Sequence, residues 1–155
     1  MKLSNLVMPT LIIVIISNII LWSVILFMIS GTITCYKKIN EMRTNGIKIE
    51  EQYGNILIPS NVTVYLVNGT LYSKTCYKED MNPLRGLYFD DTKEIFIQVG
   101  NDSDVYLYHE LLHYNFKNIL NYSTKKKIKK EYKVQCEDAD EYYAYLNSNI
   151  YAEIK

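Results

Sequence analysis

The chain has 155 residues, with 17 basic and 17 acidic side chains and a formal net charge of zero. This balance argues against a nucleic-acid-binding domain, which is expected to be clearly basic. The length allows one compact domain, or one domain with an appendage.

An appendage is visible at the N-terminus, where the run from Leu6 to Ile29 contains no charged residue. As a helix this run would be roughly 36 Å long, enough to cross a hydrocarbon core of about 30 Å. A cleaved signal peptide has a shorter apolar region and a small-residue cleavage site, which the following residues lack. We therefore predict a retained single-pass anchor within residues 1–36, with Leu6 to Ile29 in contact with the lipid bilayer.

Residues 37–54 are polar and charged and predict a juxtamembrane connector. Lys37, Lys38 and Arg43 flank the C-terminal end of the apolar run, whereas Lys2 and the amino terminus flank the other end. By a small margin, the positive-inside rule favours a cytoplasmic C-terminal domain.

Three cysteines, Cys35, Cys76 and Cys136, are widely spaced and form no C-x-x-C pair. This pattern indicates neither a ribbon-type zinc site nor a disulfide framework. Cys76 and Cys136 can pair if the domain faces outwards, and Cys35, beside the membrane, is a candidate for acylation.

The soluble domain, residues 55–155, begins with segments rich in β-branched residues. Asn68-Gly69 is a strong hairpin signal, so residues 62–67 are expected to pair with residues 70–77. A second hairpin is expected between residues 87–89 and 94–99, which a short polar turn separates.

Helical spacing replaces the strand pattern after this point. Apolar residues recur three and four apart from Asp104 to about Ile119, and Asp102 and Ser103 are candidates for the N-cap. A basic stretch follows, and the chain closes with a second helix that carries Tyr and Leu on one face. The predicted fold class is α+β, with a small β-sheet of two hairpins and two helices, preceded by one transmembrane helix.

The first helix contains His109-Glu110-Leu111-Leu112-His113, and the chain has no histidine outside this segment. Positions four apart share one helix face, so His109 and His113 can both bind one metal ion. Zinc lowers the pKa of a bound water to about 7, and Glu110 is placed to take its proton as general base. The pattern predicts a Zn²⁺ site rather than two core histidines.

A catalytic zinc site needs a third protein ligand, and no histidine is left to supply it. The second helix offers Glu137 and Glu141, which are four apart and therefore on one face. Asp138 and Asp140 are candidates to orient a histidine ring. Both glutamates stay open as the third ligand, with Cys136 as a remote alternative.

The segment Tyr-His-Glu-Leu-Leu-His-Tyr, followed by Asp-Glu-Tyr-Tyr-Ala-Tyr-Leu at residues 140–146, resembles the small gluzincin-type zinc metallopeptidases, including compact bacterial and phage proteins. In that pattern the acidic segment supplies the third ligand, which implies Glu141. The E-x-x-A-D pattern of membrane-bound zinc peptidases would place its glutamate at Cys136, so that match is broken. The resemblance covers roughly residues 87–146.

The resemblance implies a zincin-like fold, in which a small sheet lies over the active-site helix and a second ligand-bearing helix. Its edge strand would bind an extended peptide by strand addition, and residues 94–99 are expected to be that edge. A tyrosine or histidine commonly stabilises the oxyanion in such enzymes. Tyr132 is a candidate here.

The expected function is therefore a membrane-anchored zinc metallopeptidase that acts on a peptide or protein substrate. Two alternatives remain: a non-catalytic zinc-binding protein positioned by its anchor, and an accessory single-pass membrane protein in which the histidine motif is coincidental. The sequence does not indicate an oligomeric state.

Overall fold

The computed structural model describes residues 4–72, 84–131 and 139–154. The helices are α1 (Ser4–Asn45), α2 (Ser103–Tyr114), the π-helical turn η1 (Asn115–Ile119), α3 (Tyr122–Glu131) and α4 (Ala139–Ile154). The strands are β1 (Ile47–Ile49), β2 (Gln52–Tyr53), β3 (Ile56–Leu57), β4 (Thr63–Val67), β5 (Gly86–Phe89) and β6 (Glu94–Gln98). The α+β class predicted from the sequence is confirmed.

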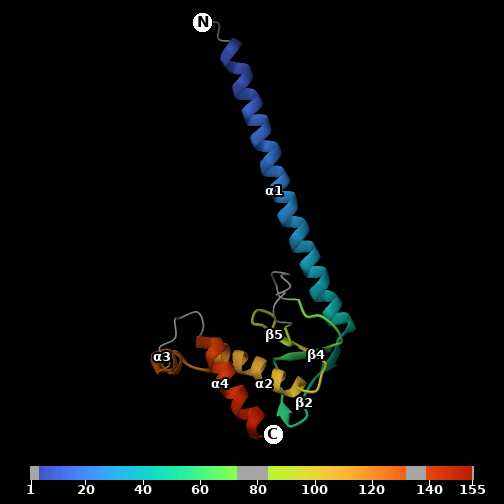
Figure 1. Ribbon diagram of the computed structural model, residues 1–155, viewed down its shortest axis with the longest axis vertical. Helices are drawn as coiled ribbons and strands as arrows, with labels where there is room; N and C mark the ends of the chain where they lie inside the picture. Colours follow the sequence, from blue (N-terminus) through green and yellow to red (C-terminus); the bar gives the residue numbers. More distant parts are fainter. Residues whose placement is uncertain (1–3, 73–83, 132–138, 155) are drawn as a thin grey trace.

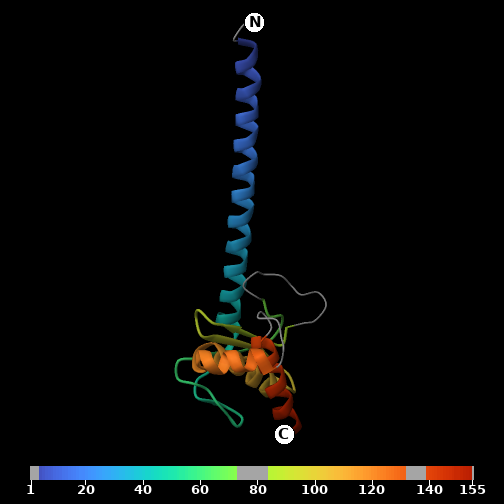
Figure 2. The ribbon, with the colours of Figure 1, turned by 90° about the vertical axis from the view of Figure 1, so that its left-hand side faces the viewer.

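Helix α1 extends far beyond a compact domain that contains all the other elements (Figures 1 and 2). It has the length and composition of a membrane span, with a mean hydropathy of 2.8 in its most apolar part. Apart from the half-buried Ile25, the apolar side chains between Ile12 and Ile29 are exposed, as expected for a helix surrounded by lipid. Within the described residues, no other helix meets this description.

The lower end of α1 is part of the domain. Residues 37–45, expected to be a connector, continue the helix, and the following residues form β1 and β2. Cys35, Ile39 and Met42 lie four and three residues apart, so they form one helix face, and this face is buried against the sheet. The charged residues around this narrow apolar stripe are the reason that the sequence predicted a connector here.

An ion pair fixes the same end of α1. The Arg43 guanidinium donates to both oxygens of Glu94, from Nε at 2.7 Å and from Nη2 at 2.6 Å. Glu94 is nearly buried, so the bidentate pair lies in a partly dry environment, where it holds both side chains in one geometry. The helix is thus joined to the first residue of β6 by packing and by charge.

The main sheet has the strand order β1-β4-β6-β5. β4 pairs with β6 in parallel, whereas β1 with β4 and β5 with β6 are antiparallel. The hairpin expected between residues 87–89 and 94–99 is present, with Leu87 opposite Phe96. The expectation that residues 94–99 form the sheet edge is wrong, because β6 has a partner on each side, and β1 and β5 are the edges.

The first expected hairpin is not seen. β4 pairs with β1 rather than with residues 70–77, of which 70–72 are not a strand and 73–77 lie outside the described residues. Asn68-Gly69 ends β4, and Gly69 has a φ of +122°, but the chain does not return along β4 within the described part. A strand from the expected connector takes that place.

Both faces of the sheet are covered. Ile95 and Ile97 of β6 point to the side of α2, where they meet Leu107 and Leu111. Phe96 points to the side of α1, where it stacks on Tyr65 and contacts Phe89. Burial on both faces explains the unbroken apolar run in β6.

Cys35 is buried and disulfide-bonded. A cysteine in this state is not available for acylation, so that expectation is wrong. The alternative pairing of Cys76 with Cys136 falls on residues outside the described part of the chain.

Candidate metal centre

Helix α2 starts from a turn closed by Ser103. The Ser103 hydroxyl accepts the N–H of Gly100 at 2.7 Å and donates to its carbonyl, while Asp102 occupies the N-cap position without a side-chain bond. Leu107 and Leu111 anchor one face of the helix on the sheet. The opposite face carries His109 and His113 towards α4, which packs along α2 (Figure 1).

Three candidate ligand residues converge between the two helices. His113 Nε2 lies 3.1 Å from His109 Nε2, and Glu141 places Oε1 at 3.3 Å from His109 Nε2 and Oε2 at 3.2 Å from His113 Nε2. Zinc ligands at 2.0–2.2 Å in tetrahedral geometry are about 3.3–3.5 Å from one another. With one ligand atom taken from each residue, the three atoms lie within 4.8 Å of one another, and this is the one such cluster among the residues that the structure describes.

The other ring nitrogen of each histidine has a polar partner. His113 Nδ1 donates to Asp140 Oδ1 at 2.9 Å, and His109 Nδ1 lies 3.2 Å from the hydroxyl of Ser148. That hydroxyl donates to the Tyr145 carbonyl, so it is free to accept the N–H of His109. With Nδ1 as the donor on each ring, both Nε2 atoms face the shared centre, the arrangement that metal-binding histidines adopt.

The pKa values of His113 and Glu141 are both shifted in the direction that favours the charged form. Burial lowers the pKa of His113, but the hydrogen bonds to Asp140 and Glu141 and the charge of Glu110 outweigh it and raise this pKa to about 10. Hydrogen bonds to His109 and His113 hold the pKa of Glu141 well below its usual range. The centre thus attracts a positive charge, which a metal ion also supplies.

Glu110 does not belong to the ligand group. It is almost fully buried, and burial, only partly offset by the two histidines, raises its pKa to about 7. Its carboxylate lies against Gly86 of β5, where an added Cβ would be 2.6 Å from Oε1. Only glycine allows β5 to approach the glutamate this closely.

An open cleft of about 290 Å³ passes between β5 and the metal centre. Its residues are Leu84, Gly86, Leu87, Tyr88, Glu110, His113, Lys117, Asp140 and Glu141. The cleft therefore joins the edge of the sheet, the buried glutamate and two of the three ligand residues.

Lys117 and Tyr88 border this cleft. Lys117 Nζ lies 3.1 Å from Asp140 Oδ2, at the back of the His113–Asp140 bond. The hydroxyl of Tyr88 donates to Asp90 and accepts from Asn118, so it is engaged outside the metal centre. Tyr132, the expected candidate for the oxyanion, lies outside the described residues.

The structure thus brings together His109, His113 and Glu141, with Asp140 behind them. Glu137, Asp138 and Cys136 lie outside the described residues. Sequence reasoning missed Ser148 and Gly86. Ser148 follows Glu141 by seven residues, two helical turns, so the spacing places both on one face of α4; nothing local distinguishes Gly86.

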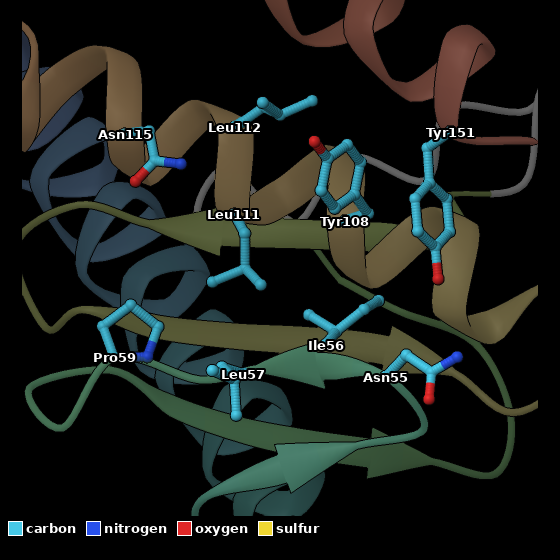
Figure 3. Close-up of a pocket in the computed structure, with 9 residues that line it drawn as sticks. All are labelled: Asn55, Ile56, Leu57, Pro59, Tyr108, Leu111, Leu112, Asn115 and Tyr151. Carbon is cyan, nitrogen blue, oxygen red and sulfur yellow. The ribbon is translucent and has the colours of Figure 1, made fainter. Parts of the chain in front are cut away.

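A second pocket, of about 300 Å³, lies between the β2–β3 hairpin and α2 (Figure 3). Tyr108 and Leu111 of α2 line it together with Ile56, Pro59 and Tyr151. It contains none of the three ligand residues and is separate from the metal centre.

Comparison of the chain with known protein families, with curated proteins and with solved structures gives no match. The case for a function therefore depends on the residues and their geometry.

Proposed function

We propose that the chain is a membrane-anchored zinc metallopeptidase, with His109, His113 and Glu141 as zinc ligands and Glu110 as general base. The observation that carries the proposal is the group of three candidate ligand residues, in which each pair approaches within 3.1–3.3 Å, beside a buried glutamate that is outside the group. A purely structural zinc site is normally closed by four protein ligands. Among the described residues this group has three, and it opens into a cleft.

The residues of the cleft have separate roles in this proposal. Zinc supplies Lewis-acid activation of water and of the scissile carbonyl. Glu110 of α2, whose carboxylate lies against Gly86, accepts the proton of the attacking water and returns it to the leaving amine. The open edge of β5 binds the substrate as an extended strand, which fixes the scissile bond beside the metal centre.

The test uses the full-length protein in detergent. We expect one zinc per chain, lost in His113→Ala and retained in Glu110→Gln, and hydrolysis of a mixed peptide library that falls at least 100-fold in Glu110→Gln. Glu51→Gln, which changes an exposed glutamate, is the matched control and should retain full activity. Absence of zinc, or an active Glu110→Gln variant, would falsify the proposal.

The alternative of a non-catalytic zinc protein gives a different result in the same experiment. The wild type would then hold one zinc without hydrolysing any peptide of the library. A coincidental histidine motif would give neither zinc nor hydrolysis.

We further propose that the domain faces an oxidising compartment, opposite to the side favoured by the flanking lysines. The disulfide of Cys35 supports this, because disulfide bonds persist in such compartments and are rare in the cytosol. A membrane-impermeant amine reagent should label the exposed lysines of α3 in intact cells. Labelling only after the cells are opened would show that the domain is cytoplasmic.

A further inference from the structure

The anchor and the domain are joined without a flexible link. α1 is one helix from Ser4 to Asn45, and its burial against the sheet begins at Cys35. Cys35 is six residues after Ile29, the end of the apolar run, which corresponds to about 9 Å along a helix. The domain therefore starts just beyond the lipid headgroup layer, which is roughly 5–7 Å thick on each side of the hydrocarbon core.

A hollow between α1 and the domain extends further along the anchor. This hollow, of about 650 Å³, is lined on one side by α1, including Phe27 and Met28, and on the other by Phe89, Asp91 and Thr92. Phe27 and Met28 belong to the uncharged run itself. The hollow beside the end of β5 and the turn that follows it thus extends along α1 as far as the last residues expected to be in lipid.

Strand β5 connects this point with the metal centre. At its first residue, Gly86 touches the carboxylate of Glu110. At its last residue, Phe89 packs in one cluster with Cys35 and Ile39 of α1. Three residues of extended chain span only about 10 Å, so the catalytic cleft and the anchor lie at the two ends of one short strand.

The outer edge of β5 has no partner strand among the described residues. A peptide added to this edge would run along β5, with one end at Glu110 and the other directed towards α1. The bound substrate would therefore extend from the metal centre towards the membrane surface.

We propose that the substrate is the membrane-proximal segment of another membrane-anchored protein, cut within about ten residues of the bilayer. This inference depends on the proposed peptidase function, to which it adds the class of substrate. The inference depends on the short, rigid attachment of the domain to its anchor, because a domain on a flexible linker would reach peptide bonds at any height above the membrane.

The experiment measures cleavage against height above the membrane. Full-length protein is reconstituted in phosphatidylcholine–phosphatidylglycerol vesicles with single-pass reporters that carry one cleavable sequence, chosen from the peptide library. Polyproline spacers of 0, about 9 or about 18 residues place that sequence at the bilayer, or roughly 28 or 56 Å above it. We expect the reporter without a spacer to be cut at least tenfold faster than the one with the longest spacer.

Two insertions after Ser30 provide matched variants, because they leave the buried face of α1 unchanged. A helical insertion of about 18 residues adds roughly 27 Å in five whole turns, so the preferred reporter should become the one with the middle spacer. A Gly-Ser insertion of the same length should remove the preference.

The soluble cleavable peptide separates the two ways of failing. If it is hydrolysed while all reporters are cut at equal rates, the membrane-proximal substrate is wrong and the peptidase function stands. If the peptide is not hydrolysed either, the peptidase function fails, and this inference fails with it.

Discussion

Replacing Asp140 with asparagine tests how the metal centre is organised. Asp140 Oδ1 accepts the N–H of His113 at 2.9 Å, and Oδ2 lies 3.1 Å from Lys117 Nζ. Asparagine keeps the size of the side chain but removes its charge. If the asparagine amide rotated so that its NH2 faced His113, that donor would oppose the ring form in which Nδ1 carries the proton.

The expected magnitude follows from comparison with the other histidine. Loss of an outer hydrogen-bond partner weakens metal binding by about 10–100-fold. The Asp140 bond is charge-assisted and short, whereas Ser148 offers His109 a neutral oxygen at 3.2 Å. Because charge-assisted bonds are roughly twice as strong, we expect about a hundredfold loss for Asp140→Asn and about a tenfold loss for Ser148→Ala.

Zinc affinity is measured by competition with a chromophoric chelator on the full-length protein, and circular dichroism checks that each variant is folded. Lys117→Met is a useful control, since it removes the second partner of Asp140 and leaves the bond to His113 in place. Equal losses in Asp140→Asn and Ser148→Ala, or no loss in either, would refute the reasoning.

Two further predictions concern β5 and the anchor. Gly86→Ala puts a Cβ 2.6 Å from Glu110 Oε1, so we expect peptide hydrolysis to fall about 100-fold with zinc content unchanged. Gly100→Ala is the control and should be neutral, because its Cβ meets nothing within 4 Å. Equal activity in the two variants would contradict the role of Gly86. Glu94→Gln breaks the pair with Arg43 and should lower the free energy of unfolding by about 1.5–3 kcal/mol at pH 7. Burial raises the pKa of Glu94, but the hydrogen bond from Arg43 reverses this and leaves the pKa below its ordinary value of 4.5. The contribution is therefore present above pH 4.5 and lost as the pH falls below it, so denaturant titrations of wild type and variant should converge in acid; a constant difference would show that the pair is not its source.

The parts of the site that sequence could predict are those fixed by spacing within one helix. His109, Glu110 and His113 are neighbours on α2 whatever the rest of the chain does. Glu141 was one of two glutamates on one helix face, and geometry across two helices decides which of them reaches the histidines. Gly86 is functional only because β5 passes Glu110, a contact that no local pattern encodes.

The sheet shows the same limit. The β5–β6 hairpin was predicted from a turn between adjacent segments, and it is present. β1 lies in a polar stretch and owes its existence to β4, with Ile47 opposite Leu66. The parallel pairing of β4 with β6 likewise joins distant segments, and it is what moves β6 from the edge to the centre.

The position of Cys35, Ile39 and Met42 also decides what a soluble fragment of this protein would be. These side chains cover Phe96, which is fully buried, together with Phe89 and Val67. A cut at Tyr36 would remove Cys35, and a cut after Met42 would uncover an aromatic surface that favours aggregation. The domain boundary therefore lies inside α1, before the helix ends at Asn45. A cut that releases the domain from the membrane within this part of α1 would remove part of the folded core.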